Sequence, residues 1–482
     1  MTDFRKMSEK KSFSARILSA SALVVGLTIG THSPAQAQSF IDALTATYNN
    51  NPTLLGARAK LRSVDEGVPQ ALANWRPEVS VSLGAGVQSI ENTLNSGTTR
   101  DQTRQQGSAS LDITQPLFRG FRTEAATQEA ENLVDAERAR LLATEQDVIL
   151  DAITAFMGVY RERAVVKLNL SNEEVMRRQL QATRERFTVG EITRTDVNQA
   201  EARMARARAD SIQAQAVLAR SVAFYQNIVG ELPSDEITPP ALPTTLPDSK
   251  GDTLKKASTQ NPNVVAAVSD LRAAFDNADE VRGELLPTVE LTAGVSREYE
   301  PSGESGRSTT AEVALNVTVP IYQQGSVYSR LREARQDAAE QNQVIDQQRR
   351  NSVQSATEAW EDMIKARAQV DAFNAQIKAN TVALNGVERE AAVGSRTILD
   401  ILDAEQELLD SRIGLVRAEH DELIASYKVM ASIGSLTAKK LELPVTHYDP
   451  MKHYNSVRDI WSGGKSEGSL MRPAGEKVKK SK

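Results

Sequence analysis

The stretch VGEITRTDVNQAEARM, residues 189–204, has a counterpart 204 residues later in VGSRTILDILDAEQEL, residues 393–408. Six of the sixteen positions are identical, among them a Gly, a Thr and an Asp at the same spacing. Glycine readily adopts the left-handed conformation that ends many helices, and threonine is a preferred N-cap of a following helix. Each stretch therefore predicts a tight turn between two helices, and the chain contains this turn twice.

The duplication extends beyond these turns. Matching segments are separated by 204 or 210 residues, which is far longer than the ~20–50 residues of a solenoid repeat. We interpret the chain as one supersecondary unit present twice, in residues 38–240 and in residues 241–443. The matching pairs are PLFRG at 116–120 with PIYQQG at 320–325, Gly230 with Gly434, and the Asn-Pro dipeptides at 51–52 and 261–262.

Each unit contains two segments in which apolar and small polar residues alternate. In PEVSVSLGAGV, residues 77–87, an apolar residue occupies every second position, and this period of two is typical of a strand with one apolar face. We expect one hairpin in each unit. The expected strands are about 77–91, 105–116, 287–299 and 308–320, with Pro77, Pro116, Pro287 and Pro320 at the helix–strand junctions, because proline does not continue a helix.

Most of the remaining sequence shows helical spacing of apolar residues. We expect long helices at 120–187 and 326–391, each followed by a shorter helix at 193–230 or 397–434. At ~1.5 Å per residue, each long helix would span roughly 100 Å. The shorter helices together with the segments before the hairpins, 51–76 and 261–286, nearly match the long helices in length. This arithmetic predicts two short helices end to end beside each long one.

The two ends of the chain differ from the repeats. Residues 1–37 contain basic residues, an apolar run from Ile17 to Gly30 and an Ala-Gln-Ala sequence at 35–37, the pattern of a secretory signal peptide. The apolar run is too short to cross a bilayer comfortably as a helix. Residues 444–482 are rich in Gly and Lys, a composition that predicts a partly disordered tail.

Composition and motifs argue against several classes of function. The formal net charge is −6, with the acidic excess in the body of the chain, so nucleic acid is not an expected partner. The chain has no cysteine and only four histidines, which excludes disulfides and cysteine-based zinc sites. Neither an H-E-x-x-H nor a G-x-S-x-G motif occurs. We therefore expect no enzymatic activity, no cofactor and no resident metal.

Four strands with one apolar face cannot close a barrel by themselves. An exported protein can turn such a face toward lipid, but a sheet in a membrane must close because open edges leave backbone groups without hydrogen bonds. Three copies would supply about twelve strands, an even number within the range of outer-membrane barrels. The strand number alone also permits two or four copies.

The signal peptide, the duplicated order of helix, two strands and two helices, the proline-flanked strands and the VG–T–D turns together resemble the TolC family of outer-membrane efflux and secretion proteins. The resemblance covers about residues 39–443. It implies a mixed α and β fold: a homotrimer with a twelve-stranded β-barrel in the outer membrane of a Gram-negative bacterium, continued across the periplasm by a long α-helical barrel. It also implies an exit duct for drugs or proteins, supplied by an inner-membrane RND or ABC transporter through a periplasmic adaptor.

The resemblance further implies roles for residues near the second turn. Asp400 and Asp403 match aspartates that line the periplasmic constriction, where three copies would form a ring of carboxylates that attracts or is blocked by cations. Arg396 matches an arginine that ties its helix to a neighbour, and Thr195 and Asp196 match the opposing partners.

Gly190 and Gly394 are the expected docking points for the adaptor at the hairpin tips. Ala391 stands where many family members have a tyrosine, so we expect Arg396 to carry a larger share of the closed state. The alternative is a periplasmic coiled-coil adaptor or scaffold. Helical length suits that alternative, whereas four alternating strands favour the membrane channel.

Overall fold

The computed structural model describes residues 39–463 except 94–95, 98, 244 and 300–305. The expected signal peptide at 1–37 lies outside the described residues, as does the end of the expected tail from residue 464 onward. None of the helices in these ranges combines the length and the apolar character that crossing a bilayer requires.

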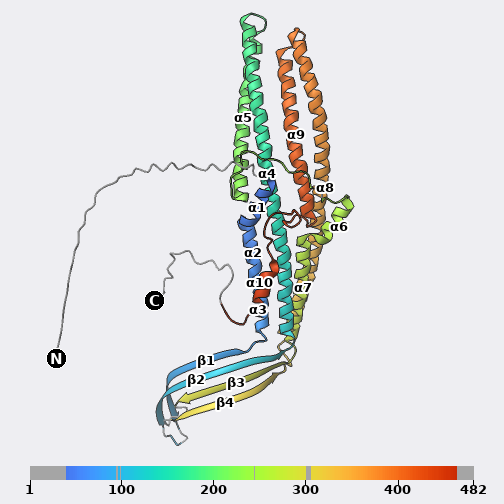
Figure 1. Cartoon of the computed structure of the whole chain (residues 1–482). Helices are drawn as coiled ribbons and strands as arrows, with labels where there is room; N and C mark the ends of the chain where they lie inside the picture. Colours follow the sequence, from blue (N-terminus) through green and yellow to red (C-terminus); the bar gives the residue numbers. More distant parts are fainter. Residues whose placement is uncertain (1–38, 94–95, 98, 244, 300–305, 464–482) are drawn as a thin grey trace, which may run out of the picture.

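Two long helical hairpins and a sheet at their base form an elongated molecule (Figure 1). The long helices α4 (Arg122–Thr188) and α8 (Ser326–Ala392) have 67 residues each. At the far end from the sheet they turn back into α5 (Arg194–Val229) and α9 (Ile398–Ser432). The two hairpins therefore present two separate tips, about 100 Å of helix away from the strands.

Shorter helices continue the line of α5 and α9 toward the sheet. In the first repeat these are α1 (Phe40–Asn50), α2 (Pro52–Asp65) and α3 (Gly67–Ala73), and in the second they are α6 (Lys250–Gln260) and α7 (Pro262–Gly283). The end-to-end arrangement expected from helix lengths is present in both repeats (Figure 1).

The same Asn-Pro dipeptide forms both joints between these stacked helices. Asn51 is the N-cap of α2, and its Nδ2 donates to the carbonyl of Ile228 near the end of α5, at 3.0 Å. Asn261 is the N-cap of α7, and its Nδ2 donates to the carbonyl of Ser432 at the end of α9, also at 3.0 Å. At each joint one asparagine thus caps the helix that begins there. It also donates a hydrogen bond to a carbonyl at the end of the stacked helix, where carbonyls have no partner within their own helix.

The four strands form one antiparallel sheet in the order β1 (Glu78–Thr93), β2 (Thr99–Arg119), β3 (Thr288–Tyr299) and β4 (Arg307–Thr318). The two hairpins join where β2 pairs with β3, with Leu111 opposite Val295. The expected mixed α and β fold with four strands per chain is confirmed. Its apolar face is uncovered in the single chain, and Leu83 is 80% exposed there.

β2 differs from the sequence-based expectation at both ends. It begins at Thr99 rather than near 105, because the backbone pairing with β1 continues through polar residues beyond the apolar alternation, as far as Thr99 opposite Thr93. It also runs past Pro116, which we expected at a junction, to Arg119. The register shifts between Pro116 and Phe118, and such an irregularity accommodates a residue that lacks a backbone donor.

The main core lies at mid-height, around α4, where the helix joints also lie. Phe156 and Tyr225 are fully buried, and Phe40 meets Phe156 edge to face with ring centroids 5.4 Å apart. Burial in the same cluster raises the pKa of Tyr427 to about 12. Large apolar side chains therefore fix the stacked helices against the continuous one.

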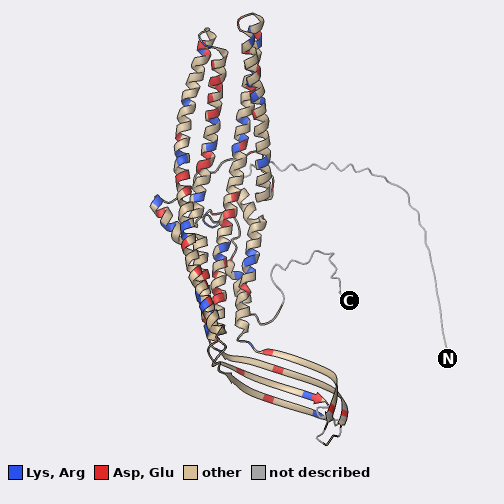
Figure 2. Ribbon diagram, turned by 180° about the vertical axis from the view of Figure 1, so that it is seen from behind, with Lys and Arg blue, Asp and Glu red and all other residues tan. Residues whose placement is uncertain are grey.

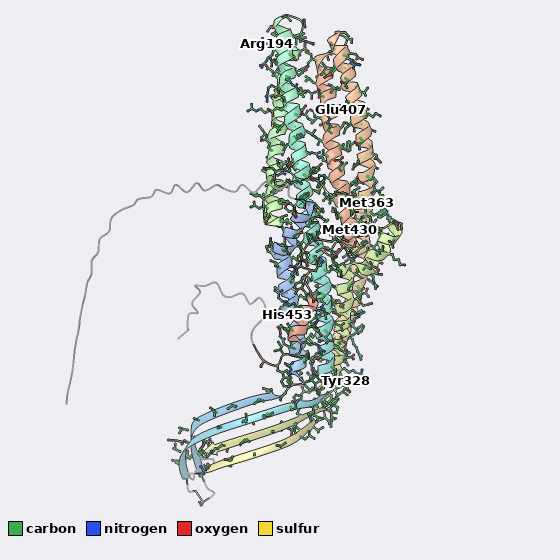
Figure 3. All side chains as sticks on the ribbon, viewed as in Figure 1. Arg194, Tyr328, Met363, Glu407, Met430 and His453 are labelled. Carbon is green, nitrogen blue, oxygen red and sulfur yellow. The ribbon has the colours of Figure 1, made fainter. Side chains whose placement is uncertain are left out.

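The segment after residue 444 folds further than its composition predicts. Helix α10 (Pro450–Val457) begins with Asp449 as N-cap and Pro450 in the first turn. His453, labelled in Figure 3, is buried with its Nδ1 3.0 Å from Oδ2 of Asp65 on α2. The composition of this Lys- and Gly-rich region did not indicate the short capped helix, which folds within the segment that we expected to be partly disordered.

Candidate functional site at the helical tips

The two tips have the same backbone geometry. Gly190 and Gly394 both have φ of 80°, in the left-handed region that favours glycine. In each turn the residue after the glycine bonds back into the long helix: the N–H of Glu191 donates to Arg186 and the N–H of Ser395 donates to Glu390. A Cβ built on either glycine meets no atom within 4 Å. Backbone conformation, and not crowding within the chain, therefore requires glycine at the tips.

Each tip also begins its returning helix with the same reciprocal cap. Thr193 caps α5, and its N–H donates to Oδ2 of Asp196 at 2.9 Å. Thr397 caps α9, and its N–H donates to Oδ2 of Asp400 at 2.8 Å. The expected N-cap roles of both threonines are confirmed.

The cap also affects the pKa of Asp400. Hydrogen bonds from the backbone and the hydroxyl of Thr397 lower the pKa of Asp400 below its usual value. The pKa falls because these donors stabilise the anion.

Side chains distinguish the tips where the backbones agree. Arg396 occupies the position equivalent to Ile192, and Ile398 the position equivalent to the exposed Arg194 labelled in Figure 3. Ile398 is only 7% exposed and belongs to an apolar cluster between the hairpins, with Met176, Ala207 and Leu402. The second tip therefore packs toward the first through Ile398 and keeps Arg396 exposed.

Arg396 makes its contacts within its own hairpin. Its Nε donates to Oε2 of Glu390 at 2.9 Å, and its Nη1 lies 4.0 Å from Oδ1 of Asp400. The neighbouring Glu390 carboxylate raises the pKa of Arg396. Among the described residues of the single chain, Arg396 is not brought to Thr195 or Asp196. The lock expected from family resemblance thus has no counterpart inside one chain.

Asp403 connects the two hairpins. Its Oδ1 accepts from Nη2 of Arg203 on α5, at 2.5 Å. Sequence reasoning missed both Arg203 and Glu390 as partners of the predicted gate residues. A comparison of the two repeats could have pointed to Arg203. The equivalent position in the second repeat is the acidic Glu407, labelled in Figure 3, so the charge changes sign at this position between the repeats.

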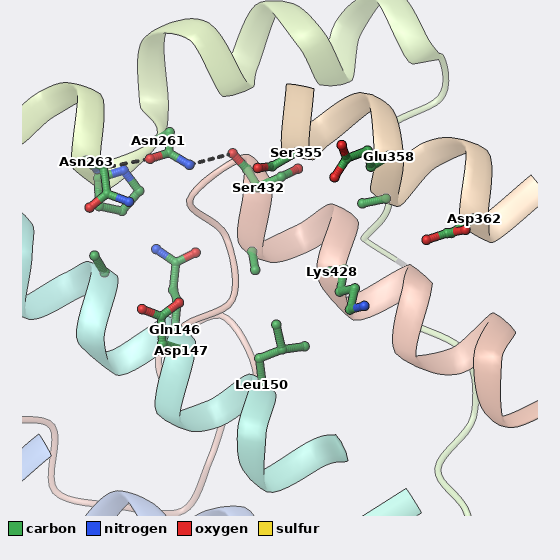
Figure 4. A pocket seen from close by; sticks show the side chains of 14 residues that line it. Gln146, Asp147, Leu150, Asn261, Asn263, Ser355, Glu358, Asp362, Lys428 and Ser432 are labelled. Carbon is green, nitrogen blue, oxygen red and sulfur yellow. Dashed lines mark hydrogen bonds between the residues drawn. The ribbon is translucent and has the colours of Figure 1, made fainter. Parts of the chain in front are cut away.

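A cavity of about 360 Å³ lies far below the tips, at the joint between α9 and α7 (Figure 4). Figure 4 shows Asn261 bonded to Asn263 on one side and to Ser432 on the other. Burial and the nearby Asp151 raise the pKa of Asp147 in its wall. In the described part of the chain, no group of three or more Asp, Glu, His or Cys side chains could hold a metal ion.

Known proteins match this chain over both repeats. Residues 44–231 and 253–435 match the family described as "Outer membrane efflux protein". Outer membrane efflux protein BepC of Brucella suis biovar 1 (strain 1330) is 35% identical over 447 residues, which are 92% of this chain and 96% of BepC. Outer membrane protein TolC of Escherichia coli (strain K12) is 25% identical over 439 residues, 87% of each chain.

The fold also matches a solved structure. The outer membrane protein VceC from Vibrio cholerae superposes with a TM-score of 0.71 at 17% identity, over 82% of this chain and 96% of VceC. Each of the two ranges matched by the family contains one strand hairpin and one helical tip.

Proposed function

This chain belongs to the outer membrane efflux protein family, which is the family resemblance detected in its sequence, and from this premise we propose that three copies form one continuous duct. The family role is that of an outer-membrane exit duct in a Gram-negative bacterium. The alternative of a periplasmic adaptor or scaffold finds no support, since the family match includes the strands.

One observation carries the proposed assembly: an open-edged sheet with an exposed apolar face at the base of a very long helical bundle. β1 and β4 are the edges of this sheet, and in lipid their unpaired backbone groups must find partners. In the trimer, β4 of one copy pairs with β1 of the next and closes a twelve-stranded barrel. Residues 38–240 and 241–443 act as the two structural repeats of each copy, and their helices continue the barrel through the periplasm.

The tips are the end of the duct that meets its partners. Gly190 and Gly394 form the docking points for a periplasmic adaptor, and the open space around both glycines supports close approach of another chain. An inner-membrane transporter of RND or ABC type supplies the cargo. That cargo is drugs or proteins, since the similar proteins include one named for efflux and others named for protease secretion.

The gate lies at the second tip. Asp400 and Asp403 of three copies form a ring of carboxylates at the periplasmic constriction, and the lowered pKa of Asp400 supports a ring that stays charged. In the closed trimer, Arg396 reaches Thr195 or Asp196 of a neighbouring copy. The capping bonds of Asp196 use its Oδ2, which leaves Oδ1 as the acceptor for this contact.

Crosslinking of detergent-extracted protein tests the assembly. We expect a three-subunit species from outer-membrane fractions, and discrete conductance steps when that species is added to planar bilayers. A soluble monomer recovered from the periplasm would contradict the proposed duct. Deletion of the gene should sensitise cells to drugs, whereas loss of a secreted protein without drug sensitivity would favour the secretion role.

A further inference from the structure

The cavity at the Asn261 joint is walled by a single chain. Residues of α4, α7, α8 and α9 line it (Figure 4). Its volume is about 360 Å³, within the range of ~300–1,000 Å³ that is typical of small-molecule sites. Each copy of the chain therefore supplies all the residues of this cavity.

A buried amide without partners distinguishes this cavity from an ordinary gap between helices. Gln146 on α4 is only 3% exposed, and Figure 4 shows its side chain directed into the cavity. Within the described part of the chain, neither Oε1 nor Nε2 of Gln146 has a hydrogen-bond partner. Burial of an amide without partners disfavours folding. A ligand hydroxyl group could satisfy either atom, because it both donates and accepts hydrogen bonds.

Further polar side chains surround the same space. Asn263 on α7 and Ser355 on α8 add an amide and a hydroxyl to the lining. Asn261 is already engaged, since its Nδ2 donates to the carbonyl of Ser432 at 3.0 Å. The wall thus offers hydrogen bonds from several helices, which suits a ligand with more than one hydroxyl group.

The charged groups at the cavity are mainly acidic. Charged side chains are spread along both helical hairpins (Figure 2), so their presence alone does not indicate a site. The charged residues that line this cavity are Asp147, Glu358, Asp362 and Lys428. Asp362 is paired with Lys365, whose Nζ lies 2.5 Å from Oδ1 of Asp362. Two carboxylates then remain against one ammonium group, and this balance favours a positively charged ligand.

The placement of these carboxylates suits an organic cation better than a metal ion. Among the residues that the structure describes, no three Asp, Glu, His or Cys side chains gather closely enough to hold a metal. Asp147 belongs to α4, whereas Glu358 belongs to α8 in another wall of the cavity (Figure 4). An organic molecule can contact a carboxylate with its ammonium group and the Gln146 amide with a neighbouring hydroxyl group.

We propose that this cavity binds a small organic cation of the amino sugar class, in which a protonated amine lies beside hydroxyl groups. The ammonium group interacts with the carboxylates of Asp147 and Glu358, and hydroxyl groups bond to the amide of Gln146. The bound molecule contacts α7 and α9, the two helices that meet at the Asn261 joint. Because the site lies within one chain, it goes beyond the proposed duct and does not depend on the trimer.

Two sugars that differ at one position test the ligand class. Glucosamine and glucose share the same ring, but protonated glucosamine has an ammonium group in place of one hydroxyl group. Binding of each sugar to the full-length protein in detergent is measured by saturation-transfer NMR. We expect glucosamine to bind up to about fivefold more tightly, which is the effect of one accessible ion pair. Equal binding of the two sugars, or binding of neither, would overturn the proposal.

Substitution of the carboxylates tests the ammonium contact. Asp147→Asn with Glu358→Gln should abolish the preference for glucosamine over glucose. Asp337→Asn with Glu340→Gln removes the same charge from exposed positions of α8 outside the cavity and should retain the preference. A preference that survives the first pair of substitutions would contradict the proposed contact.

Substitution of Lys428 distinguishes a cationic ligand from an anionic one. Lys428→Gln should strengthen glucosamine binding by up to about fivefold, because it removes a like charge from the cavity. Weaker binding of glucosamine to this variant would overturn the proposed ligand class.

Substitution of Gln146 separates a binding role from a structural one. Gln146→Leu should weaken the binding of both sugars severalfold. It should also raise the free energy of unfolding, because it removes a buried amide that has no partner in the described chain. Unchanged binding together with a lower free energy of unfolding would assign Gln146 to the fold alone and contradict the proposal.

Crosslinking of the same preparations distinguishes this inference from the proposed duct. A crosslinked trimer that binds neither sugar contradicts only the ligand site. A protein that binds glucosamine as proposed but forms no trimer contradicts only the duct.

Discussion

The two helical tips share a backbone and differ in chemistry. Both turn at a glycine with φ of 80° and both restart with a Thr–Asp cap at nearly equal distances. The first tip has Ile192 where the second has Arg396, and the acid that crosses between hairpins, Asp403, comes from the second. The duplication thus preserved the turn in both repeats, while the arginine of the proposed lock and Asp403 of the proposed ring occur only in the second.

Substitution of the turn glycines, Gly190 and Gly394, tests the backbone turn that the two tips share. We expect the largest loss of function from these variants. Gly190→Val and Gly394→Val each place a branched side chain at positive φ, which L-residues rarely adopt, and each would block the proposed docking surface. We expect drug resistance to fall to the level of a deletion strain for either variant, with trimers still detected by crosslinking. Gly158→Ala, in the middle of α4, is the control and should retain resistance. Normal efflux from both tip variants would mean that the tips are turns only.

Substitution of Arg396 tests the difference between the tips, because the first tip has Ile192 at the equivalent position. Arg396→Ser removes the contacts with Glu390 and Asp400 and the proposed contact with a neighbouring copy. We expect a severalfold rise in single-channel conductance in planar bilayers. Arg194→Ser removes an exposed arginine from the first tip and should leave conductance unchanged. An equal rise in conductance in both variants would contradict a functional difference between the tips.

The carboxylates of Asp400 and Asp403 provide a second test of the difference between the two tips. Asp400→Ala with Asp403→Ala should weaken cation selectivity and abolish block by multivalent cations added on the periplasmic side. Thr193→Ala removes the cap of α5 at the first tip without touching the proposed gate residues, so it controls for loss of a cap. If the double variant retains selectivity and block, the ring lies elsewhere in the duct.

The pH dependence of block follows from the cap on Asp400. The folded pKa is lower than the usual 3.8, so the carboxylate is charged throughout the range above 3.8. The stabilising contribution of the cap is present above that value and is lost only as pH falls through the lowered folded pKa. We expect cation block to persist from pH 7 down to pH 4 in bilayer recordings. A midpoint of block near pH 6 would show instead that neighbouring carboxylates raise the pKa in the trimer.

The smallest expected effect concerns the joints, where the two repeats are alike again. Asn51→Ala and Asn261→Ala each remove a helix cap, at a cost of about 0.5–2 kcal/mol. We expect similar decreases in the free energy of unfolding, measured by chemical denaturation in detergent. A much larger loss at one joint would show that the repeats differ in their scaffold as well as in their tips.

The sequence revealed the features that are local and periodic. Turn glycines, N-cap threonines and alternating strands follow from short-range backbone chemistry, and duplication reinforced each of them. The pairing of Asp403 with Arg203 was hidden, because 200 residues separate the two and only the packing of hairpins brings them together. The polar start of β2 and the helix α10 were missed for a related reason: partners elsewhere in the chain stabilise them, and their own composition does not reveal it.

The Asn-Pro joints have a mechanical consequence. Each chain contains two unbroken columns, α4 and α8, and two columns divided at mid-height, α5 with α2 and α9 with α7. At each division a single asparagine side chain bonds across the gap, in place of the several backbone bonds of a continuous helix turn. A rotation of the tips relative to the sheet could therefore occur by sliding of the stacked helices at the Asn51 and Asn261 joints, without unwinding a helix. We therefore expect any movement of the tips relative to the sheet to be concentrated at these two joints.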